Sequence, residues 1–215
     1  MLELIEREFS NIDGKLNSAK RNQVQRKLFK NLPETDDELI DLFDNLVNKA
    51  DWHVFWIVMI WIKRKELYKK DYMKYYEDWL YNKIDSWGSC DVFCYRVLNP
   101  MLERHEELYD KVLIWAESEK TYVRRAAPVS LLESTRSFKV NYPFKKVINV
   151  VNKLKADDEY YVQKGVGWLL KYTYLSYPEQ TIDYLKSNVD VLPRIVFRYA
   201  LEKTPKKVKQ ELMQL

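Results

Sequence analysis

The feature that most constrains the fold is a helix-pair pattern that returns at nearly constant spacing along the chain. In each occurrence an aromatic or large apolar residue opens the second helix of a pair, and these residues lie 35, 35, 39 and 31 positions apart. They are Trp52, Trp87, Tyr122, Tyr161 and Leu192. This spacing is typical of two-helix solenoid repeats, which bury their apolar faces by stacking on one another. The pattern predicts an all-α protein, a curved superhelical solenoid of antiparallel helix pairs.

Composition agrees with a helical protein that has one sizeable core. Of the 215 residues, 47% are hydrophobic and 32% are charged, a balance typical of an ordered globular domain. Only 4 Gly and 7 Pro leave little turn chemistry for the many hairpins of an all-β fold. We therefore expect a single all-helical domain over 1–215. Its parts are N-terminal helices over 1–35, the repeats over 36–204 and a C-terminal helix over 205–215.

Helix boundaries follow from the spacing of apolar residues and from capping residues. Helices are expected over 1–10, 17–31, 36–49, 52–68 and 71–83, from Asn99-Pro100 to about Glu117, and from Thr121 to about Arg136. Five later helices are expected to start at Pro143, at Asp157 or Asp158, at Pro178, at Leu192-Pro193 and at Thr204-Pro205. The helix over 52–68 is apolar nearly all round, which predicts burial on several sides. We find no convincing alternating strand.

The two cysteines, Cys90 and Cys94, lie four positions apart. On one helix they could not easily form a disulfide, so we expect reduced thiols, small core residues and a cytoplasmic protein. With only His53 and His105 to join them, no zinc-binding spacing is present, and no metal or cofactor is expected. The most apolar segment, 52–62, is too short to span a bilayer, and the N-terminus lacks the features of a secretion signal. We expect no membrane partner.

Charge is distributed unevenly between the two halves of the chain. Residues 1–110 contain 17 Lys and Arg against 21 Asp and Glu, a balance of −4, whereas residues 111–215 contain 19 against 11, a balance of +8. Such asymmetry suggests an anionic partner for the C-terminal half, and nucleic acid is the commonest one. A solvated lysine-rich face explains the charge equally well.

The stretch Asp85–Asp91 contains the strongest candidate for chemistry. If it opens a helix, Trp87 and Asp91 lie one turn apart on one face. At the position of Asp91 the other repeats carry residues that cannot ionise, namely Trp56, Ala126, Gly165 and Val196. A carboxylate that breaks such a pattern is expected at a functional site. The alternative is a helix cap followed by a tryptophan in the core.

One place earlier in the same register stand Arg125 and Lys164, with Arg194 close by. The second helices of such pairs commonly line the concave face of a solenoid. Basic residues near their starts would form a positive stripe, which the helix N-termini reinforce and which phosphates would occupy.

Several further segments follow in a fixed order at fitting distances. They are Tyr122-Val-Arg-Arg-Ala-Ala, Tyr161-Val-Gln-Lys-Gly-Val-Gly-Trp-Leu-Leu-Lys171, Tyr177-Pro178 and Arg198-Tyr-Ala-Leu-Glu-Lys203. With these segments and the Trp87–Asp91 pair, the chain resembles the DNA alkylation repair family of HEAT-like repeat glycosylases, the AlkD group. The resemblance covers roughly residues 36–204. No family signature is found before residue 36, and Tyr122 stands where relatives usually have Trp.

The resemblance implies excision of cationic N3- or N7-alkylated purines, such as 3-methyladenine and 7-methylguanine, from double-stranded DNA, without insertion of the base into a pocket. It implies that Trp87 and Trp168 contact the backbone and sugar of the lesion nucleotide, that Asp91 lies near the glycosidic carbon and that Arg125 supports the site. The chemistry agrees. A positively charged purine is already a good leaving group, so one carboxylate that stabilises an oxocarbenium-like sugar and positions water is the main requirement. Arg125 would either anchor a phosphate or hold Asp91.

Candidate phosphate contacts are basic residues in the C-terminal half. They are Arg124, Lys164, Lys171, Arg194 and Arg198. Four of the site residues also have a plain structural explanation: Trp168 as a core residue, Arg125 as part of a surface ion pair, and Lys164 and Lys171 as solvated side chains. A monomer is expected, because bent DNA needs an open concave face.

Two other functions fit the same fold. One is a non-catalytic protein that binds distorted or branched DNA, which would keep the basic stripe but should lack the acid at Asp91. The other is a protein-binding scaffold, whose concave face would be apolar or mixed. Salt dependence separates the scaffold from the DNA-binding alternatives, because phosphate contacts impose a steep loss of affinity with salt.

Overall fold

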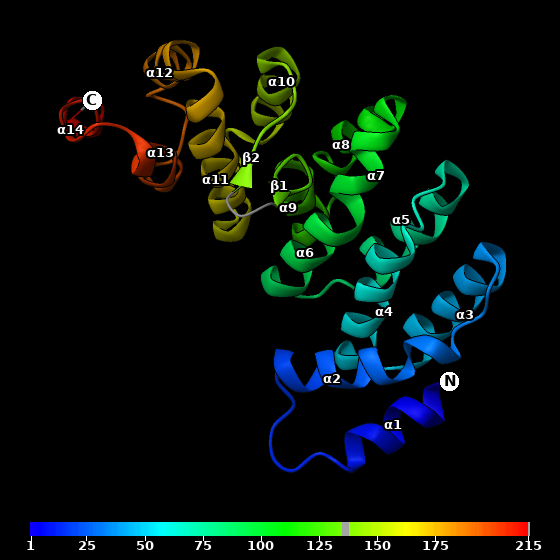
Figure 1. The fold of residues 1–215 in the computed structure, drawn as a ribbon. Helices are drawn as coiled ribbons and strands as arrows, with labels where there is room; N and C mark the ends of the chain where they lie inside the picture. Colours follow the sequence, from blue (N-terminus) through cyan, green and yellow to red (C-terminus); the bar gives the residue numbers. More distant parts are fainter. Residues whose placement is uncertain (135–137, 215) are drawn as a thin grey trace. The chain divides into compact units, whose positions relative to one another are not determined.

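The structure is a computed structural model that describes residues 1–134 and 138–214, and the chain is 75% helical with one two-stranded hairpin among these residues (Figure 1). The all-α, helical-repeat class that the sequence predicts is confirmed. Internal contacts divide the chain into two compact units, Met1–Lys83 and Ile84–Leu215. The single domain over 1–215 stays a prediction.

The first unit contains five α-helices and two 3-10 turns among its described elements. These are α1 (Leu2–Ser10), α2 (Ser18–Leu28), the 3-10 turn η1 (Phe29–Asn31), α3 (Asp36–Lys49), α4 (Trp52–Lys65), the 3-10 turn η2 (Lys70–Tyr72) and α5 (Met73–Lys83). Capping side chains fix the starts of three of the α-helices, which are α2, α3 and α4. The side chain of Thr35 accepts the backbone N–H of Glu38 at 3.4 Å, and that of Asp51 accepts the N–H of His53 at 2.9 Å.

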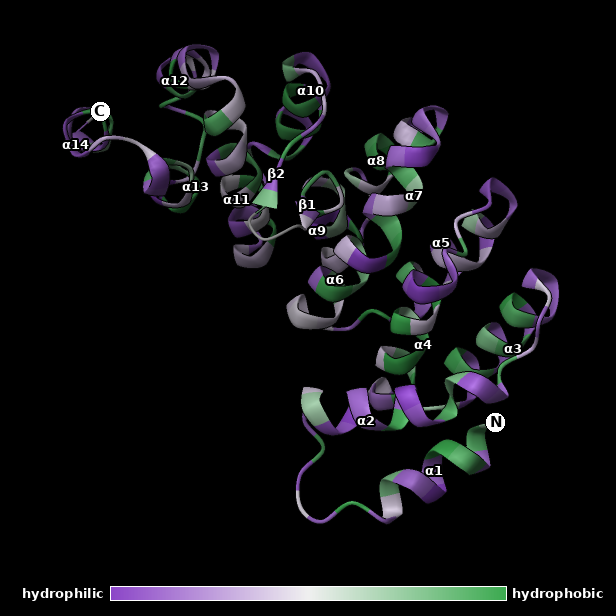
Figure 2. Cartoon of the chain, in the orientation of Figure 1, coloured by the Kyte–Doolittle hydropathy of each residue, from purple (hydrophilic) through white to green (hydrophobic). Residues whose placement is uncertain are grey.

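Helix α4 forms the core of the first unit. It is hydrophobic from Val54 to Ile62 and ends in the basic turn Lys63–Lys65, whereas α2 is largely hydrophilic (Figure 2). Trp61 of α4 is fully buried, stacks on Phe43 at a centroid distance of 5.8 Å and donates its indole N–H to the carbonyl of Gln25 at 3.1 Å. The prediction that this helix is buried on several sides is confirmed.

The second unit contains the segment that carries the candidate chemistry. Its elements are α6 (Trp87–Phe93), the π-helical segment η3 (Cys94–Leu98), α7 (Asn99–Arg104), the 3-10 turn η4 (Glu106–Leu108), α8 (Tyr109–Trp115), α9 (Thr121–Val129), β1 (Glu133–Ser134), β2 (Phe138–Lys139), α10 (Phe144–Leu154), α11 (Tyr160–Ser176), α12 (Pro178–Ser187), α13 (Arg194–Ala200), the 3-10 turn η5 (Leu201–Lys203) and α14 (Lys206–Gln214). The five later helix starts that the sequence predicts are confirmed to within two residues.

Helix α11 packs against α9 on one side and α13 on another. A Cβ atom added at Gly167 would lie 2.6 Å from the Cβ of Tyr199 and 3.0 Å from the carbonyl oxygen of Val196, so only glycine permits this approach. Gly165 faces α9, where an added Cβ would lie 3.3 Å from Pro128 and 3.5 Å from the guanidinium of Arg125. The two glycines therefore allow α11 to pack closely against both neighbouring helices.

The prediction of a helix from Thr121 to about Arg136 without strands is wrong. Helix α9 ends at Val129, one residue after Pro128, which removes a hydrogen-bond donor from its last turn. Strands β1 and β2 then pair antiparallel, with Glu133 opposite Lys139 and an ion pair of 2.7 Å between their side chains. Arg136 lies outside the described residues.

The prediction of one helix from Asn99 to about Glu117 is also wrong. The path breaks at His105, whose backbone is not helical (φ −133°, ψ 82°), and resumes in η4 and α8. Asn99 is not an N-cap, because it continues the helical path of η3. It is buried, and its side chain donates to the carbonyl of Ser130 at 3.0 Å.

Candidate functional site

The start of α6 is fixed by a reciprocal capping box. The Ser86 hydroxyl accepts the backbone N–H of Ser89 at 3.3 Å, and the Ser89 hydroxyl accepts the N–H of Ser86 at 3.2 Å. This cap places Trp87 at the first helical position, where 51% of its surface is exposed. The alternative of a helix cap followed by a core tryptophan is therefore half right, because the cap is present but Trp87 is not a core residue.

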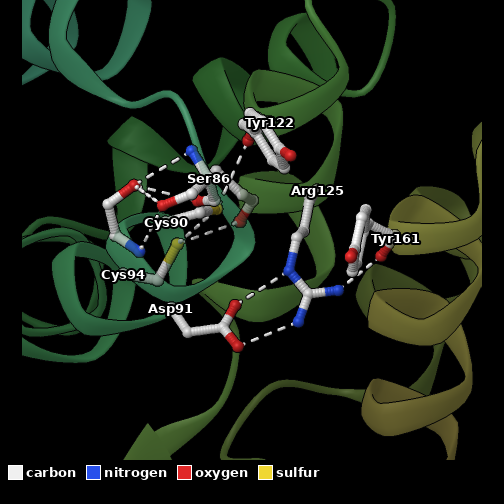
Figure 3. Close-up of polar contacts among 9 residues, drawn as sticks. Ser86, Cys90, Asp91, Cys94, Tyr122, Arg125 and Tyr161 are labelled. Atoms are coloured by element: carbon white, nitrogen blue, oxygen red, sulfur yellow. Dashed lines mark hydrogen bonds and ion pairs between the residues drawn. The ribbon is translucent and has the colours of Figure 1, made fainter.

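Asp91 lies one turn after Trp87 and is buried, with 6% of its surface exposed. Arg125 of α9 is buried beside it and donates its Nε–H to Asp91 Oδ1 and one Nη2–H to Asp91 Oδ2, both at 2.9 Å (Figure 3). The remaining guanidinium nitrogen donates to the backbone carbonyl of Tyr161 on α11. Of the two arrangements that the sequence leaves open for Arg125, the structure has the one that holds Asp91.

The electrostatics of this pair combine burial with charge. Burial raises the pKa of the Asp91 carboxyl above its ordinary value, while the hydrogen bonds and charge of Arg125 and the charge of Lys164 act in the opposite direction. Both carboxyl oxygens accept from the same guanidinium, which is the geometry of a charge-assisted ion pair. The pair is therefore held in a fixed orientation in a largely buried position. Removing either residue would leave the charge of the other buried and without its counterpart.

Aromatic side chains surround the N-terminal ends of the helices that carry the pair. The ring of Tyr161 lies nearly parallel to Trp87, at a centroid distance of 6.5 Å and an interplanar angle of 16°. Tyr122 of α9 is tilted by 45° against the same tyrosine at 6.3 Å. Three of the residues that open the predicted repeats thus meet in one cluster.

A second aromatic group lies on the other side of Asp91 along the helix. Tyr95 of η3 follows Asp91 by four residues, and its ring contacts Phe138 of β2 edge-on at 5.9 Å. Phe138 contacts Trp168 of α11 at 4.8 Å, and Trp168 is half-buried. Burial and the nearby negative charge of Asp91 raise the pKa of Tyr95.

Sequence reasoning missed Tyr95 and Phe138. The spacing of four between Trp87, Asp91 and Tyr95 was a signal for the first, because it places all three on one helical stripe. No comparable signal marks Phe138, since its hairpin was expected to be helix. The structure therefore brings Asp91, Arg125 and Tyr161 into direct contact and places Trp87 and Trp168 in separate aromatic groups.

Comparison with known proteins decides the family. A family model described as DNA alkylation repair enzyme matches residues 16–204. The chain belongs to the DNA alkylation repair enzyme family. The match begins at residue 16, so the expectation that no family signature lies before residue 36 is wrong.

Solved structures of this fold are similar over nearly the whole chain. A predicted DNA alkylation repair enzyme from Enterococcus faecalis has a TM-score of 0.71 at 14% identity, covering 89% of this chain and 87% of its own. AlkD2 from Streptococcus mutans has a TM-score of 0.65 at 17% identity, covering 94% of this chain and 96% of its own. A search of curated proteins finds no match. The chain is thus a repair enzyme of alkylated DNA, with DNA as its partner.

In this DNA alkylation repair enzyme, most of the basic side chains expected to contact phosphate have protein partners. Arg124 donates its Nε–H to Asp157 at 2.6 Å and also binds backbone carbonyls, and Lys171 pairs with Glu202 at 2.6 Å. Arg194 is exposed and donates to the carbonyl of Met213. Arg198 is exposed, with no hydrogen bond or ion pair to another residue within 1–134 and 138–214.

The cysteines and the metal-binding types of side chain do not form a site. Cys90 and Cys94 are free and buried, with their sulfur atoms 3.9 Å apart, and burial raises the pKa of the Cys94 thiol. The expectation that both are small core residues is confirmed. Within the described part of the chain, no group of three or more His, Cys, Asp or Glu side chains could hold a metal ion. No helix among residues 1–134 and 138–214 is long and apolar enough to cross a membrane.

Proposed function

We propose that this repair enzyme is a DNA glycosylase, which hydrolyses the N-glycosidic bond of cationic N3- or N7-alkylated purines in double-stranded DNA. The observation that carries the proposal is the buried carboxylate of Asp91, held in one orientation by Arg125 and located one helical turn from the exposed Trp87. Family membership supplies the class of DNA damage.

The chemistry assigned to Asp91 is electrostatic. An alkylated purine carries positive charge and leaves readily, which builds up oxocarbenium character on the sugar, and a preoriented carboxylate stabilises that charge without reorganisation. Arg125 donates one hydrogen bond to each carboxylate oxygen of Asp91. Each oxygen keeps a second lone pair, which can accept a hydrogen bond from the attacking water and orient it. Trp87 and Trp168 would flank the sugar and exclude solvent, which strengthens the field of Asp91.

The rest of the proposal concerns DNA binding and the state of the protein. Arg198 and Lys164 are the basic residues best available to phosphate, whereas Arg124 and Lys171 are engaged with carboxylates. We take the protein to act as a monomer in the cytoplasm. The two free cysteines support the latter, because reduced thiols are typical of that compartment.

The decisive experiment is release of purine from N-methylated duplex DNA by the wild type and by Asp91→Asn. We expect the wild type to release base, and the variant to lose about 10²–10³-fold in rate, as when one preorganised electrostatic group is removed from an active site. DNA affinity should stay close to wild type. If the wild type releases no purine the proposal fails, and if Asp91→Asn is as fast as wild type the role of Asp91 is wrong.

Two further variants guard against misfolding as the cause of a loss. Asp157→Asn removes the same type of carboxylate from the neighbouring Arg124 pair and should keep the rate of base release. The double variant Asp91→Asn with Arg125→Gln removes both buried charges, so it should fold more stably than Asp91→Asn and still release base slowly.

A second function is favoured by one observation. The Nε, Nη1 and Nη2 atoms of Arg125 all donate to the protein, which is what a purely structural brace requires. In that case the chain binds distorted or branched DNA without cutting the glycosidic bond. Salt-dependent DNA binding without base release by the wild type would establish this alternative.

A further inference from the structure

Two exposed aromatic side chains of the second unit lie at the N-terminal ends of α6 and α11. Trp87 and Tyr160 are exposed over 51% and 50% of their surfaces. Tyr161 joins them, since its ring is nearly parallel to Trp87 and meets Tyr160 edge-on at a centroid distance of 5.3 Å. Large aromatic rings that lie together in solvent usually mark a binding surface.

A lysine lies next to this surface, beside Tyr160. The ammonium of Lys164 lies 5.0 Å from the ring centroid of Tyr160 and 5.3 Å from that of Tyr199 on α13. A hydrogen bond with the hydroxyl of Tyr199 raises the pKa of Lys164, although desolvation acts against it, so the amine keeps its charge at neutral pH. The structure thus places the charge that the sequence assigns to a phosphate beside two aromatic rings.

The geometry of this arrangement is fixed by the backbone. Tyr160 is the first residue of α11, and Lys164 follows one turn later on the same face. Tyr199 is held by the close approach of α13 to α11 at Gly167, where no side chain would fit. The rings and the ammonium are therefore positioned before any ligand arrives.

We propose that Tyr160, Lys164 and Tyr199 form a platform that binds an unpaired nucleobase of DNA. A base inside an intact duplex has both faces covered by its neighbours, so an aromatic platform can stack only on a base that has left the helix. The lysine supplies a positive charge for the adjoining phosphate. The inference rests on the proposed function only for its ligand, double-stranded DNA, and not for the excision of a base.

The test compares two DNA duplexes that differ by one unpaired nucleotide. A fluorescent 2-aminopurine is placed either as a single-base bulge or opposite thymine in a fully paired duplex, and binding is followed by anisotropy and by quenching of the probe at fixed salt. We expect the wild type to prefer the bulged duplex by about tenfold, the lower part of the range for stacking one base on an aromatic side chain. The bulged probe should also be quenched.

Substitutions on α11 separate stacking from other causes. Tyr160→Ala should lose both the preference and the quenching, and Tyr160→Phe should keep them, because stacking needs the ring and not the hydroxyl. Lys164→Gln should weaken binding to the bulged duplex and make its salt dependence shallower. Tyr174→Ala is the matched control, since Tyr174 is also half-exposed on α11, about 21 Å further along the helix axis.

These outcomes test the platform independently of the glycosylase activity. Equal affinity of the wild type for the two duplexes, or an unchanged preference in Tyr160→Ala, would overturn the platform even if purine is released. A preference that depends on Tyr160 in a protein that releases no purine would leave the platform in place and remove the glycosylase. Loss of the preference in Tyr174→Ala would point to a general disturbance of α11 and would also overturn the assignment to Tyr160.

Discussion

Two neighbouring arginines on α9 make ion pairs that have the same chemistry and different surroundings. Arg124 binds Asp157 and also donates to the carbonyls of Ser118 and Glu119 at 2.9 Å, so it ties the start of α9 to the loop before α11. Arg125 binds Asp91 on α6, between two groups of aromatic rings.

The difference shows that an Arg–Asp pair by itself is no sign of catalysis. Asp157 accepts the backbone N–H of Glu159 at 2.9 Å with its second oxygen, so it has a structural role within its own loop. Asp91 has no such backbone partner among the described residues and lies one turn from an exposed tryptophan. The surroundings, and not the pair, make Asp91 the candidate for chemistry.

The largest expected effect that separates the two pairs is on stability. Arg125→Ala leaves the buried Asp91 without its partner and should lower the free energy of unfolding by about 3–5 kcal/mol. Arg124→Ala should cost about 1–3 kcal/mol, because Arg124 is less buried and water can reach the groups it leaves behind. Chemical denaturation measures both.

A double-mutant cycle provides the control for this prediction. Arg125→Ala combined with Asp91→Ala removes both charges and should be less destabilised than the sum of the two single variants. Equal losses for Arg124→Ala and Arg125→Ala would contradict the distinction between the pairs.

A smaller effect is expected on DNA binding. The sequence assigned Arg124 and Arg198 alike to phosphates, but only Arg198 is exposed, whereas Arg124 is bound within the protein. Arg198→Ala should reduce the slope of log affinity against log salt by about 0.9, the value for one phosphate contact. Arg124→Ala should leave this slope unchanged when binding is measured under conditions in which the variant is fully folded. A reduced slope in the Arg124 variant would return that residue to the set of phosphate contacts.

The smallest expected effect is on an ionisation near the site. Burial and the charge of Asp91 both raise the pKa of Tyr95, so replacing the charge in Asp91→Asn should lower that pKa while burial keeps it above the ordinary value. NMR of ring-labelled tyrosine during an alkaline titration follows Tyr95, which is assigned from the spectrum of Tyr95→Phe. Asp157→Asn should not change this pKa, and a shift there would mean that the two carboxylates do not act separately.

Local signals in the sequence predicted most of the helices. Thr35 and Asp51 cap α3 and α4 at the predicted places, because a capping side chain acts on backbone groups within three residues. The hairpin at Glu133–Lys139 was missed since its pairing depends on contacts with other elements, such as the packing of Phe138 on Trp168. The break in the helix at His105 was missed for the same reason, because it too depends on contacts with other elements.

The sequence also determined the distance at which partners occur. Asp91 and Arg125 are 34 residues apart, Arg124 and Asp157 are 33 apart, and Lys171 and Glu202 are 31 apart. These separations are close to the repeat spacing, because each pair joins one repeat to the next. The sequence therefore places a partner one repeat away, and holding Asp91 is one of the two roles that it left open for Arg125.

What the sequence by itself determined is the helical class, the repeat spacing, the family resemblance and the exceptional carboxylate at Asp91. Only the tertiary structure decided which charges are neutralised within the protein and which remain for DNA. An arginine reaches several neighbours across a helix packing, and the choice among them depends on side-chain geometry and burial that no local pattern encodes. For that reason two arginines adjacent in sequence, Arg124 and Arg125, bind different partners on different elements.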